Sequence, residues 1–221
     1  MQLQNALLHS LPDLKVEGDH RIANNLASLS GIIRLQSAAI RKGGKSYRAE
    51  DVCSILQDLG MRIEVTARLH KYLANSPAGS TIDLGRFIRD VCESLELLAP
   101  TGQLVLKVGC RCLAAVEAGV ALPIGLLIAE LVTNSAKYGH PTGLPVKIAL
   151  ECETQSNGGF TLRFEDDGVG LPENFDPSSD GGLGFRLMRA MADHLKATLT
   201  FNHDELGLRC ELVKESGQLA S

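Results

Sequence analysis

The chain has 221 residues, a hydrophobic fraction of 44% and a net charge of -4 from 22 basic and 26 acidic side chains. This length and composition are typical of one large or two modest globular domains. Because there is no surplus of positive charge, electrostatics give no support to a nucleic-acid or anionic-membrane partner. We therefore expect a protein or small-molecule partner and no nucleic acid.

Six cysteines are scattered along the chain, and the closest pair, Cys110 and Cys112, lacks the two-residue spacer of a zinc or redox motif. Free thiols in a cytoplasmic protein without a secretion signal are therefore expected. No apolar run approaches the roughly 18–20 residues that span a bilayer. The longest candidate, residues 118–129, is short and contains Pro123. The sequence thus predicts a soluble protein with no membrane insertion.

Two amphipathic helices are predicted in the first third of the chain. Apolar residues recur at intervals of three and four across residues 11–41, and again from Ala49 to about Asn75. The glycine pair at residues 43–44 interrupts the pattern, and residues 76–80 end the second helix. Two helices joined by a short loop form an antiparallel hairpin, whose apolar seams a single copy cannot bury. We therefore predict a homodimer in which two hairpins pair as a four-helix bundle.

The pattern changes after residue 78 to one of mixed helices and strands. We expect helices at residues 82–98, 122–138 and 185–194, and strands at residues 104–108, 146–154, 160–165, 198–202 and 208–213. Residues 156–159 are the expected turn of a hairpin. Helices that cover one face of a mostly antiparallel sheet form an α+β sandwich. The predicted domains are the hairpin, residues 1–78, and the sandwich, residues 79–221.

The segment AELVTNSAKYG, residues 129–139, holds the first candidate site residues. Three or four positions separate its polar members, so they share one face of the predicted helix: Glu130, Asn134, Lys137 and Tyr138. Glu130 and Asn134 lie among apolar residues, where an unpartnered charge or amide is costly. Alone, the pair is consistent with an acid near a helix start and a capping-type amide. Beside a phosphate group, their oxygens would suit a magnesium ion.

The motif EDDGVG, residues 165–170, places Asp166 at the end of a predicted strand. Gly168 and Gly170 follow in a turn where the backbone can approach a ligand closely. By itself the motif could be an ordinary turn or a calcium-like loop, although a Leu-Pro pair interrupts the acidic positions that a calcium loop needs.

A further glycine motif, DGGLG at residues 180–184, directly precedes a predicted helix. Free backbone N–H groups and the helix dipole make such a helix start a phosphate site. One glycine cluster is weak evidence. Behind an acid-amide helix and a strand-end aspartate, it indicates a nucleotide bound with magnesium.

The segments ELVTNSAKYG, EDDGVGLP and GGLGFRLM resemble, in order and spacing, the Asn box and two glycine boxes of the ATP-binding domain of sensor histidine kinases. The resemblance covers residues 82–213 and extends to the wider gyrase, Hsp90, kinase and MutL class. It implies ATP and Mg²⁺ as cofactors, with Asp166 bonding the adenine amino group and Asn134, beside Glu130, holding magnesium. It also implies nucleotide, lid or phosphate-loop contacts for Lys137, Tyr138, Gly168, Gly170, Gly182, Leu183 and Gly184. The implied lid, residues 171–181, is short.

The upstream segment DHRIANNL, residues 19–26, resembles the His-Arg-x-x-Asn-Asn-Leu phosphoacceptor segment of the subgroup allied to the so-called HWE kinases. Residues 62–70 similarly resemble the second helix of that subgroup. The resemblance implies that His20 accepts the γ-phosphate of ATP. Taken alone, one histidine on a helix would be a surface or capping residue.

Two further roles are expected around His20. Many histidine kinases place an acid directly after the histidine, but here that position is Arg21, which leaves Asp19 and Glu17 as alternative catalytic acids. Both could instead stabilise the first turn of the helix. Asn24 lies one turn after His20 on the same face, where it could orient water against a phosphorylated aspartate.

The sequence therefore predicts a histidine kinase core that phosphorylates itself on His20 and transfers the phosphoryl group to an aspartate of a response regulator. The alternative is a non-catalytic phosphotransfer or scaffold module with a retained nucleotide fold, which the presence of Asn134 and Asp166 disfavours. A serine-phosphorylating anti-sigma kinase is also disfavoured, because it would not need the His20 hairpin. About ten residues precede the first predicted helix, so the input is expected from a separate sensor protein or from a segment absent from this sequence.

Overall fold

The computed structural model describes residues 48–74, 81–99, 104–140, 144–177, 179–204 and 207–216, together with Gly102 and scattered positions between residues 30 and 41. The chain divides into two compact units, Met1–His70 and Lys71–Ser221, and each is considered by itself. The predicted boundary at residues 78 and 79 stays a prediction, because that linker lies outside the described residues.

Helix α2, Ala49–Ala74, lies mostly in the first unit and confirms the second predicted helix. Thr66 Oγ1 donates to the Arg62 carbonyl at 2.7 Å, and an exposed Glu64–Arg68 pair of 2.7 Å joins successive turns. In the first predicted helix, the described positions between residues 30 and 41 are helical. Its earlier part lies outside the described residues, and with it the whole phosphoacceptor segment.

The second unit is built on a five-stranded sheet in the order β2-β4-β5-β7-β6. The strands are β2 (Leu104–Arg111), β4 (Val146–Thr154), β5 (Phe160–Asp166), β6 (Thr198–Asp204) and β7 (Gly207–Lys214). β2 runs parallel to β4, and all other neighbouring pairs in this sheet are antiparallel. The predicted hairpin is present, with the Gln155 amide donating to the Gly159 carbonyl at 2.8 Å across its turn.

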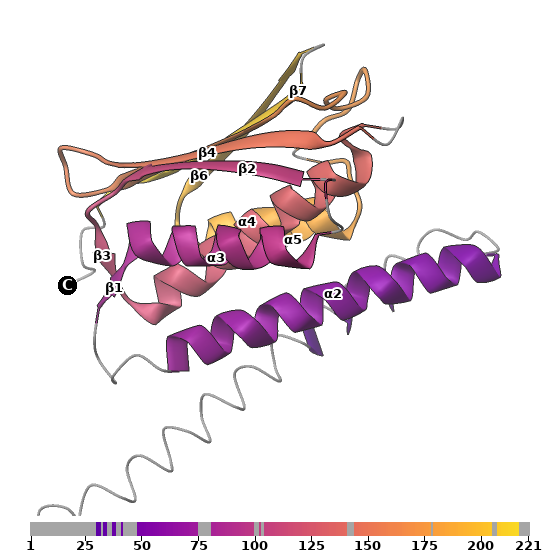
Figure 1. Cartoon of the computed structure of the whole chain (residues 1–221), viewed down its shortest axis with the longest axis horizontal. Coiled ribbons are helices and arrows are strands. Elements are labelled where there is room, and N and C mark those ends of the chain that lie inside the picture. Colours follow the sequence, from indigo (N-terminus) through magenta and orange to yellow (C-terminus); the bar gives the residue numbers. More distant parts are fainter. Residues whose placement is uncertain are drawn as a thin grey trace, which may run out of the picture. The chain divides into compact units, whose positions relative to one another are not determined.

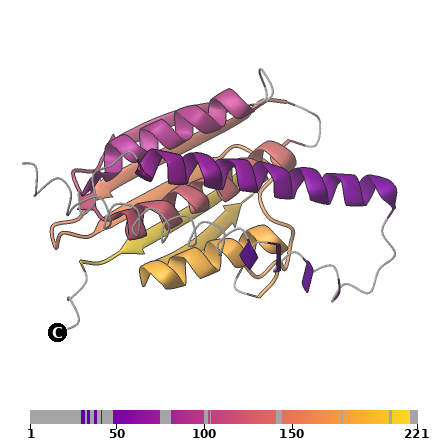
Figure 2. The same cartoon turned by 90° about the horizontal axis from the view of Figure 1, so that it is seen from below.

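Three helices cover one face of this sheet: α3 (Leu84–Leu98), α4 (Ala118–Tyr138) and α5 (Leu183–Leu195). They lie side by side with α4 in the middle, and the other face of the sheet carries no described helix of this unit (Figures 1 and 2). Alternate residues of β4 point to the helices, and Ile148 and Leu150 are no more than 1% exposed. The predicted α+β sandwich is confirmed.

The region predicted as one helix over residues 82–98 begins differently. Ile82 and Asp83 form the short strand β1, which pairs antiparallel with β3, Ala115–Val116. α3 starts only at Leu84, because Asp83 adopts an extended conformation and its Oδ1 accepts from the Arg86 amide at 2.8 Å as an N-cap. The prediction was therefore wrong for the first two residues of this helix.

Helix α4 is longer than predicted. It starts at Ala118 and continues through Pro123, whose missing N–H removes one bond, that to the Gly119 carbonyl. The sequence analysis expected the apolar run that contains Pro123 to be too short to span a bilayer. That expectation was wrong, because the helix is longer than the run. In the described part of the chain, α4 is the one helix long and apolar enough to cross a membrane, with a mean hydropathy of 1.5, and 61% of that window is buried inside the protein. A buried core helix passes the same test.

Candidate functional site

The acid and the amide predicted on one helix face lie in the middle of α4. Glu130 is 7% exposed and Asn134 is half-buried, whereas Lys137 and Tyr138 in the last turn are exposed. The Lys137 ammonium lies 5.4 Å from the centroid of the Tyr138 ring. The predicted face is therefore present, and it passes from the interior to the solvent toward the end of the helix.

The start of α5 packs against the face of α4 that carries Glu130 and Asn134. A Cβ atom added to Gly184 would lie 2.9 Å from Glu130 Oε2, 3.2 Å from Asn134 Nδ2 and 3.4 Å from Asn134 Oδ1. The glycine therefore allows the beginning of α5 to touch both polar side chains of α4. Gly182 is the N-cap of α5, and Leu183 is its first residue. The Glu-Asn pair and the glycine-rich helix start therefore lie next to each other in the structure. They are about fifty residues apart in the sequence.

We expect Gly184→Ala to weaken the affinity for ATP by about 5–150-fold, the equivalent of the roughly 1–3 kcal/mol that overpacking of this kind typically costs. The added methyl group would press on Glu130 and Asn134. Gly182→Ala is the matched control, because a Cβ at Gly182 meets nothing within 4 Å. Titration of each variant with a fluorescent ATP analogue measures the difference. Equal losses in the two variants would contradict this steric argument.

The side chain of Asp166 is fixed by three donors. Its Oδ2 accepts from Ser135 Oγ on α4 at 2.5 Å, and its Oδ1 accepts from the amides of Gly168 at 3.0 Å and Leu208 at 3.1 Å. A carboxylate has about four lone-pair sites, so three donors leave room for about one more. An amino group of a ligand could take that position.

The turn after Asp166 packs directly on the end of α4. The Val169 amide donates to the Gly139 carbonyl at 2.9 Å, and a Cβ on Gly168 would lie 2.7 Å from the Gly139 Cα atom. Only two glycines permit such an approach of the two backbones. α4 therefore contacts both glycine motifs, one at Gly139 and the other through Glu130 and Asn134.

The second aspartate of the motif, Asp167, faces a different set of groups. Its Oδ1 accepts from the Lys147 amide at 2.7 Å and lies 3.2 Å from His140 Nε2. Burial acts to raise the pKa of Asp167, but the hydrogen bonds from Lys147 and His140 outweigh it and hold this pKa below its usual value. Asp167 is thus an anion that ties the segment after α4 to the start of β4.

The predicted lid, residues 171–181, is anchored on α5. The rings of Phe175 and Phe185 lie 5.0 Å apart between centroids. Arg189 Nη1 donates to the Pro177 carbonyl, and also to the Asp180 carbonyl at 3.2 Å. Gly170, which precedes this segment, has a φ of 69°. The described lid residues therefore fold back over the helix that begins at the glycine motif.

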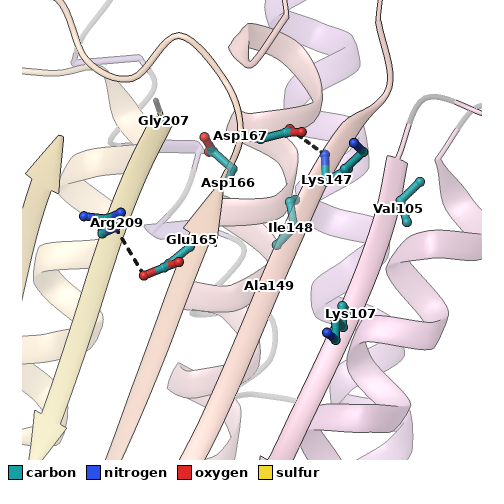
Figure 3. A pocket seen from close by; sticks show the side chains of 10 residues that line it. All are labelled: Val105, Lys107, Lys147, Ile148, Ala149, Glu165, Asp166, Asp167, Gly207 and Arg209. Atoms are coloured by element: carbon teal, nitrogen blue, oxygen red, sulfur yellow. Dashed lines mark hydrogen bonds and ion pairs between the residues drawn. The ribbon is translucent and has the colours of Figure 1, made fainter. Parts of the chain in front are cut away.

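A hollow of about 390 Å³ opens on the face of the sheet away from the helices. Figure 3 looks onto the strands with the helices behind them, and shows Lys107, Lys147 and Arg209 among the lining side chains. Arg209 Nε pairs with Glu165 Oε1 at 3.2 Å. Of the predicted nucleotide residues, only Asp166 is part of this lining, so the hollow is separate from the place formed by Glu130, Asn134 and Gly184.

The donor set suits magnesium only in part. Within the described ranges, no group of three or more His, Cys, Asp or Glu side chains could hold a metal ion. Glu130 and Asn134 offer one carboxylate and one amide oxygen beside the start of α5. Magnesium usually keeps several waters and takes one or two protein carboxylates together with substrate phosphates, so this small set fits a metal bound with a nucleotide.

Two polar contacts of this region were not predicted. Ser135 is 3% exposed and bonds Asp166, and His140 contacts Asp167. A signal for Ser135 was available, because a small polar residue on an otherwise apolar helix needs a partner. His140 had no comparable signal. His20, Asp19, Glu17 and Asn24 lie outside the described residues, so their positions stay predictions.

Comparison with known proteins finds matches for both parts of the chain. Residues 17–99 match a family model described as histidine kinase, and residues 119–216 match one described as histidine kinase-, DNA gyrase B- and HSP90-like ATPase. Blue-light-activated histidine kinase 2 of Erythrobacter litoralis is 26% identical over 195 residues, which are 86% of this chain and 54% of that protein. The sensor histidine kinase PdtaS of Mycobacterium tuberculosis is 22% identical over 173 residues, 78% of this chain and 33% of that protein.

Among solved structures, the histidine kinase domain of the Erythrobacter litoralis EL346 blue-light activated histidine kinase has a TM-score of 0.67 at 24% identity. The match covers 92% of this chain and 94% of that one. At this identity the likeness shows the fold alone. The chain spans about half the length of the Erythrobacter relative and about a third of PdtaS.

Proposed function

Because this chain belongs to the sensor histidine kinases, with one part that matches a histidine kinase model and another that matches an ATPase model, we propose that it phosphorylates itself on His20 with Mg-ATP. We propose further that it passes the phosphoryl group to an aspartate of a response regulator. One observation carries the nucleotide part of the proposal: Gly184 brings the start of α5 against Glu130 and Asn134. The response regulator itself is a partner class that the family implies.

The proposed site divides the work of binding ATP between three elements. Asp166, at the end of β5, would accept a hydrogen bond from the adenine amino group. The amides at the start of α5 would face the phosphates, since orphan N–H groups and the helix dipole favour anions there. Asn134, with Glu130 beside it, would hold the magnesium ion. When bound, this ion would offset the negative charge on the phosphate oxygens. Lys137 and Tyr138 would contact the nucleotide at the exposed end of α4.

In the transfer itself, a neutral imidazole nitrogen of His20 attacks the γ-phosphorus in line, and ADP leaves. A carboxylate bonded to the other ring nitrogen, from Asp19 or Glu17, would hold the required tautomer and stabilise the cation that forms. Glu130 would act as a catalytic, polarising acid within the nucleotide site, although in related ATPases an acid at the same position activates water instead. Asn24, one turn beyond His20, would orient water for dephosphorylation of the partner. Equal losses of kinase and phosphatase activity in Asn24→Ala would contradict that separate role.

The proposal is tested by incubating the protein with Mg-ATP labelled at the γ-phosphate. We expect label on the protein that is lost in acid and kept in alkali, as is typical of phosphohistidine. A label stable in acid would favour a serine kinase. The absence of label would favour the alternative, a phosphotransfer or scaffold module that retains a nucleotide fold without catalysis.

The input signal would come from a separate sensor protein or from a longer chain. A cytoplasmic location would follow from the need for ATP.

The helical unit supports a proposal of homodimerisation. Val52 and Leu56 lie one turn apart on α2 and are 43% and 59% exposed within one chain. A second hairpin would cover such a seam in a four-helix bundle. We expect sedimentation at micromolar concentration to give a dimer and Leu56→Glu to shift it to a monomer. Leu97→Glu on α3, a site 84% exposed, is the control that should stay dimeric. A monomeric parent protein would contradict the proposal.

A further inference from the structure

Four thiols gather where α3 packs on β2, near the ends of β2 and β4. They are Cys92 on α3, Cys110 on β2, Cys112 directly after β2, and Cys152 on β4, and we call them the thiol cluster. The parallel register sets Cys110 beside Cys152. Thr154 Oγ1, two residues further along β4, donates to Cys112 Sγ at 3.6 Å. The sequence motifs gave no hint of this cluster, because Cys92 and Cys152 are far along the chain from the pair Cys110 and Cys112.

The members of the cluster differ in access to solvent. Cys92 is 1% exposed, Cys112 is 4% exposed and Cys152 is 0% exposed. Cys110 is half-buried. A dissolved reagent would therefore meet Cys110 first, with Cys152 directly behind it in the neighbouring strand.

The pKa values of the thiols also differ, and the more accessible thiol has the lowered pKa. A hydrogen bond from the Cys152 thiol lowers the pKa of Cys110, and the nearby Arg89 guanidinium adds to this effect against the opposing effect of burial. Arg89 is held there, since its Nη1 donates to the Cys110 carbonyl at 3.4 Å. Burial raises the pKa of Cys92 to about 12, and the bond to Cys110 raises the pKa of Cys152. In the pair Cys110 and Cys152, the accessible thiol is thus the one whose pKa is lowered, which favours its reactive thiolate.

We propose that Cys110 is a redox modification site that a hydroperoxide oxidises and that then closes into a reversible disulfide with Cys152. Neighbouring strands lie about 4.8 Å apart, within the roughly 4.4–6.8 Å between Cα atoms that a disulfide bridges. This site goes beyond the proposed kinase function and does not depend on it.

The chemistry is balanced with hydrogen peroxide as the oxidant. The Cys110 thiolate attacks one peroxide oxygen, the O–O bond breaks, and hydroxide leaves and takes up a proton as water. Cys110 is then a sulfenic acid, oxidised by two electrons. The Cys152 sulfur attacks it, an S–S bond forms and the S–O bond breaks, and the second water carries away the thiol proton. A dithiol returns both residues to thiols by exchange.

The cluster lies at the end of the sheet away from the proposed nucleotide site. Lys147, which bonds Asp167, and Cys152 are five residues apart on β4, a separation of about 17 Å along a strand. The cluster is instead close to the start of α3, where the Leu84 amide donates to the Ala114 carbonyl at 3.0 Å. A disulfide would attach the edge strand β2 covalently to β4 beside this corner.

The test uses the full chain, reduced and then exposed to hydrogen peroxide, followed by alkylation and peptide mapping by mass spectrometry. We expect a Cys110–Cys152 linked peptide that dithiothreitol removes. Cys110→Ser should slow the loss of Cys152 alkylation at least about tenfold, since the thiolate is the nucleophile. Cys152→Ser should stop at a sulfenic acid on Cys110, which dimedone traps. Cys53→Ser, which removes the exposed thiol of α2, is the control and should leave the linked peptide unchanged.

Three results would overturn the proposal. One is oxidation of Cys53 at a rate equal to or above that of Cys110. Another is a linked peptide that joins Cys112 instead of Cys110 to Cys152. The last is recovery of both Cys110 and Cys152 as alkylated thiols in the parent protein, which needs no variant and so cannot be confused with a folding defect. Phosphorylation with labelled ATP is a separate measurement, so the kinase proposal and this one can fail independently.

Discussion

His20→Ala is expected to remove all ATP-dependent label from the protein. Alanine has no nitrogen that could attack the γ-phosphorus, so the loss should reach background instead of a partial decrease. Binding of a fluorescent ATP analogue should stay within about twofold of the parent, because His20 is not among the residues proposed to contact the nucleotide, and substitutions outside a site usually cost less than about 0.5 kcal/mol. The measurement is autoradiography after denaturing electrophoresis, combined with the binding titration.

His194→Ala is the matched control for this variant. His194 is an exposed residue in the last turn of α5, remote along that helix from Gly184. It should keep the full label. If His20→Ala were labelled like the parent, the assignment of His20 as the acceptor would be wrong. If His20→Ala lost label together with ATP binding, the variant would have damaged the fold and would say nothing specific about the acceptor.

Asp166→Asn is expected to weaken ATP binding by about 10–100-fold, the equivalent of the roughly 1.5–3 kcal/mol that a hydrogen bond to a charged group contributes. The carboxylate accepts from Ser135 Oγ, and its other oxygen accepts from the Gly168 and Leu208 amides. An amide has only one acceptor oxygen. Its NH₂ group must therefore face either the hydroxyl or the two backbone donors, so the turn after β5 is held less well.

Asp167→Asn is the control, because it makes the same change of charge at the adjacent residue. The Asp167 carboxylate bonds the Lys147 amide and His140, a set of partners that differs entirely from the three donors to Asp166. We expect its ATP affinity to change by less than about fivefold, as for an exposed ion pair worth below about 1 kcal/mol. Calorimetric titration and a thermal melt of each variant separate binding from stability. Equal affinities for the two variants would contradict the special role of Asp166.

The architecture of the sandwich followed from local patterns. The alternation along β4, and the Ser-Asn-Gly-Gly turn after it, predicted a hairpin that the structure contains. The helix face with Glu130 and Asn134 was readable for the same reason, since it depends only on the spacing within one helix. These features depend on residues that lie close together in the chain, so the local sequence pattern was sufficient to predict them.

The errors have a common physical cause, which is pairing between distant segments. Ile82 pairs with Val116, thirty-four positions later, and no pattern within residues 82–98 records that partner. The helix predicted from residue 122 also missed the turn before Pro123, where Ala121 is buried in the interior. The contact of Gly184 with Glu130 likewise depends on tertiary structure. Local spacing does not predict that contact, and only the resemblance to a family assigned both residues to one nucleotide site.

The placement of α4 in the chain also has a consequence during protein synthesis. α4 ends at Tyr138, and two of the elements that pack on it, β4 and α5, follow it in the chain, as does most of the sheet. At about 5–20 residues per second, a ribosome needs about 4–15 s to translate from residue 138 to residue 214. For that time an apolar helix of 21 residues leaves the ribosome without its sheet. Chaperone crosslinking to nascent chains should therefore be strong for chains that expose α4 and weak once β7 has emerged. Equal crosslinking to both would show that α4 is shielded before its sheet is complete.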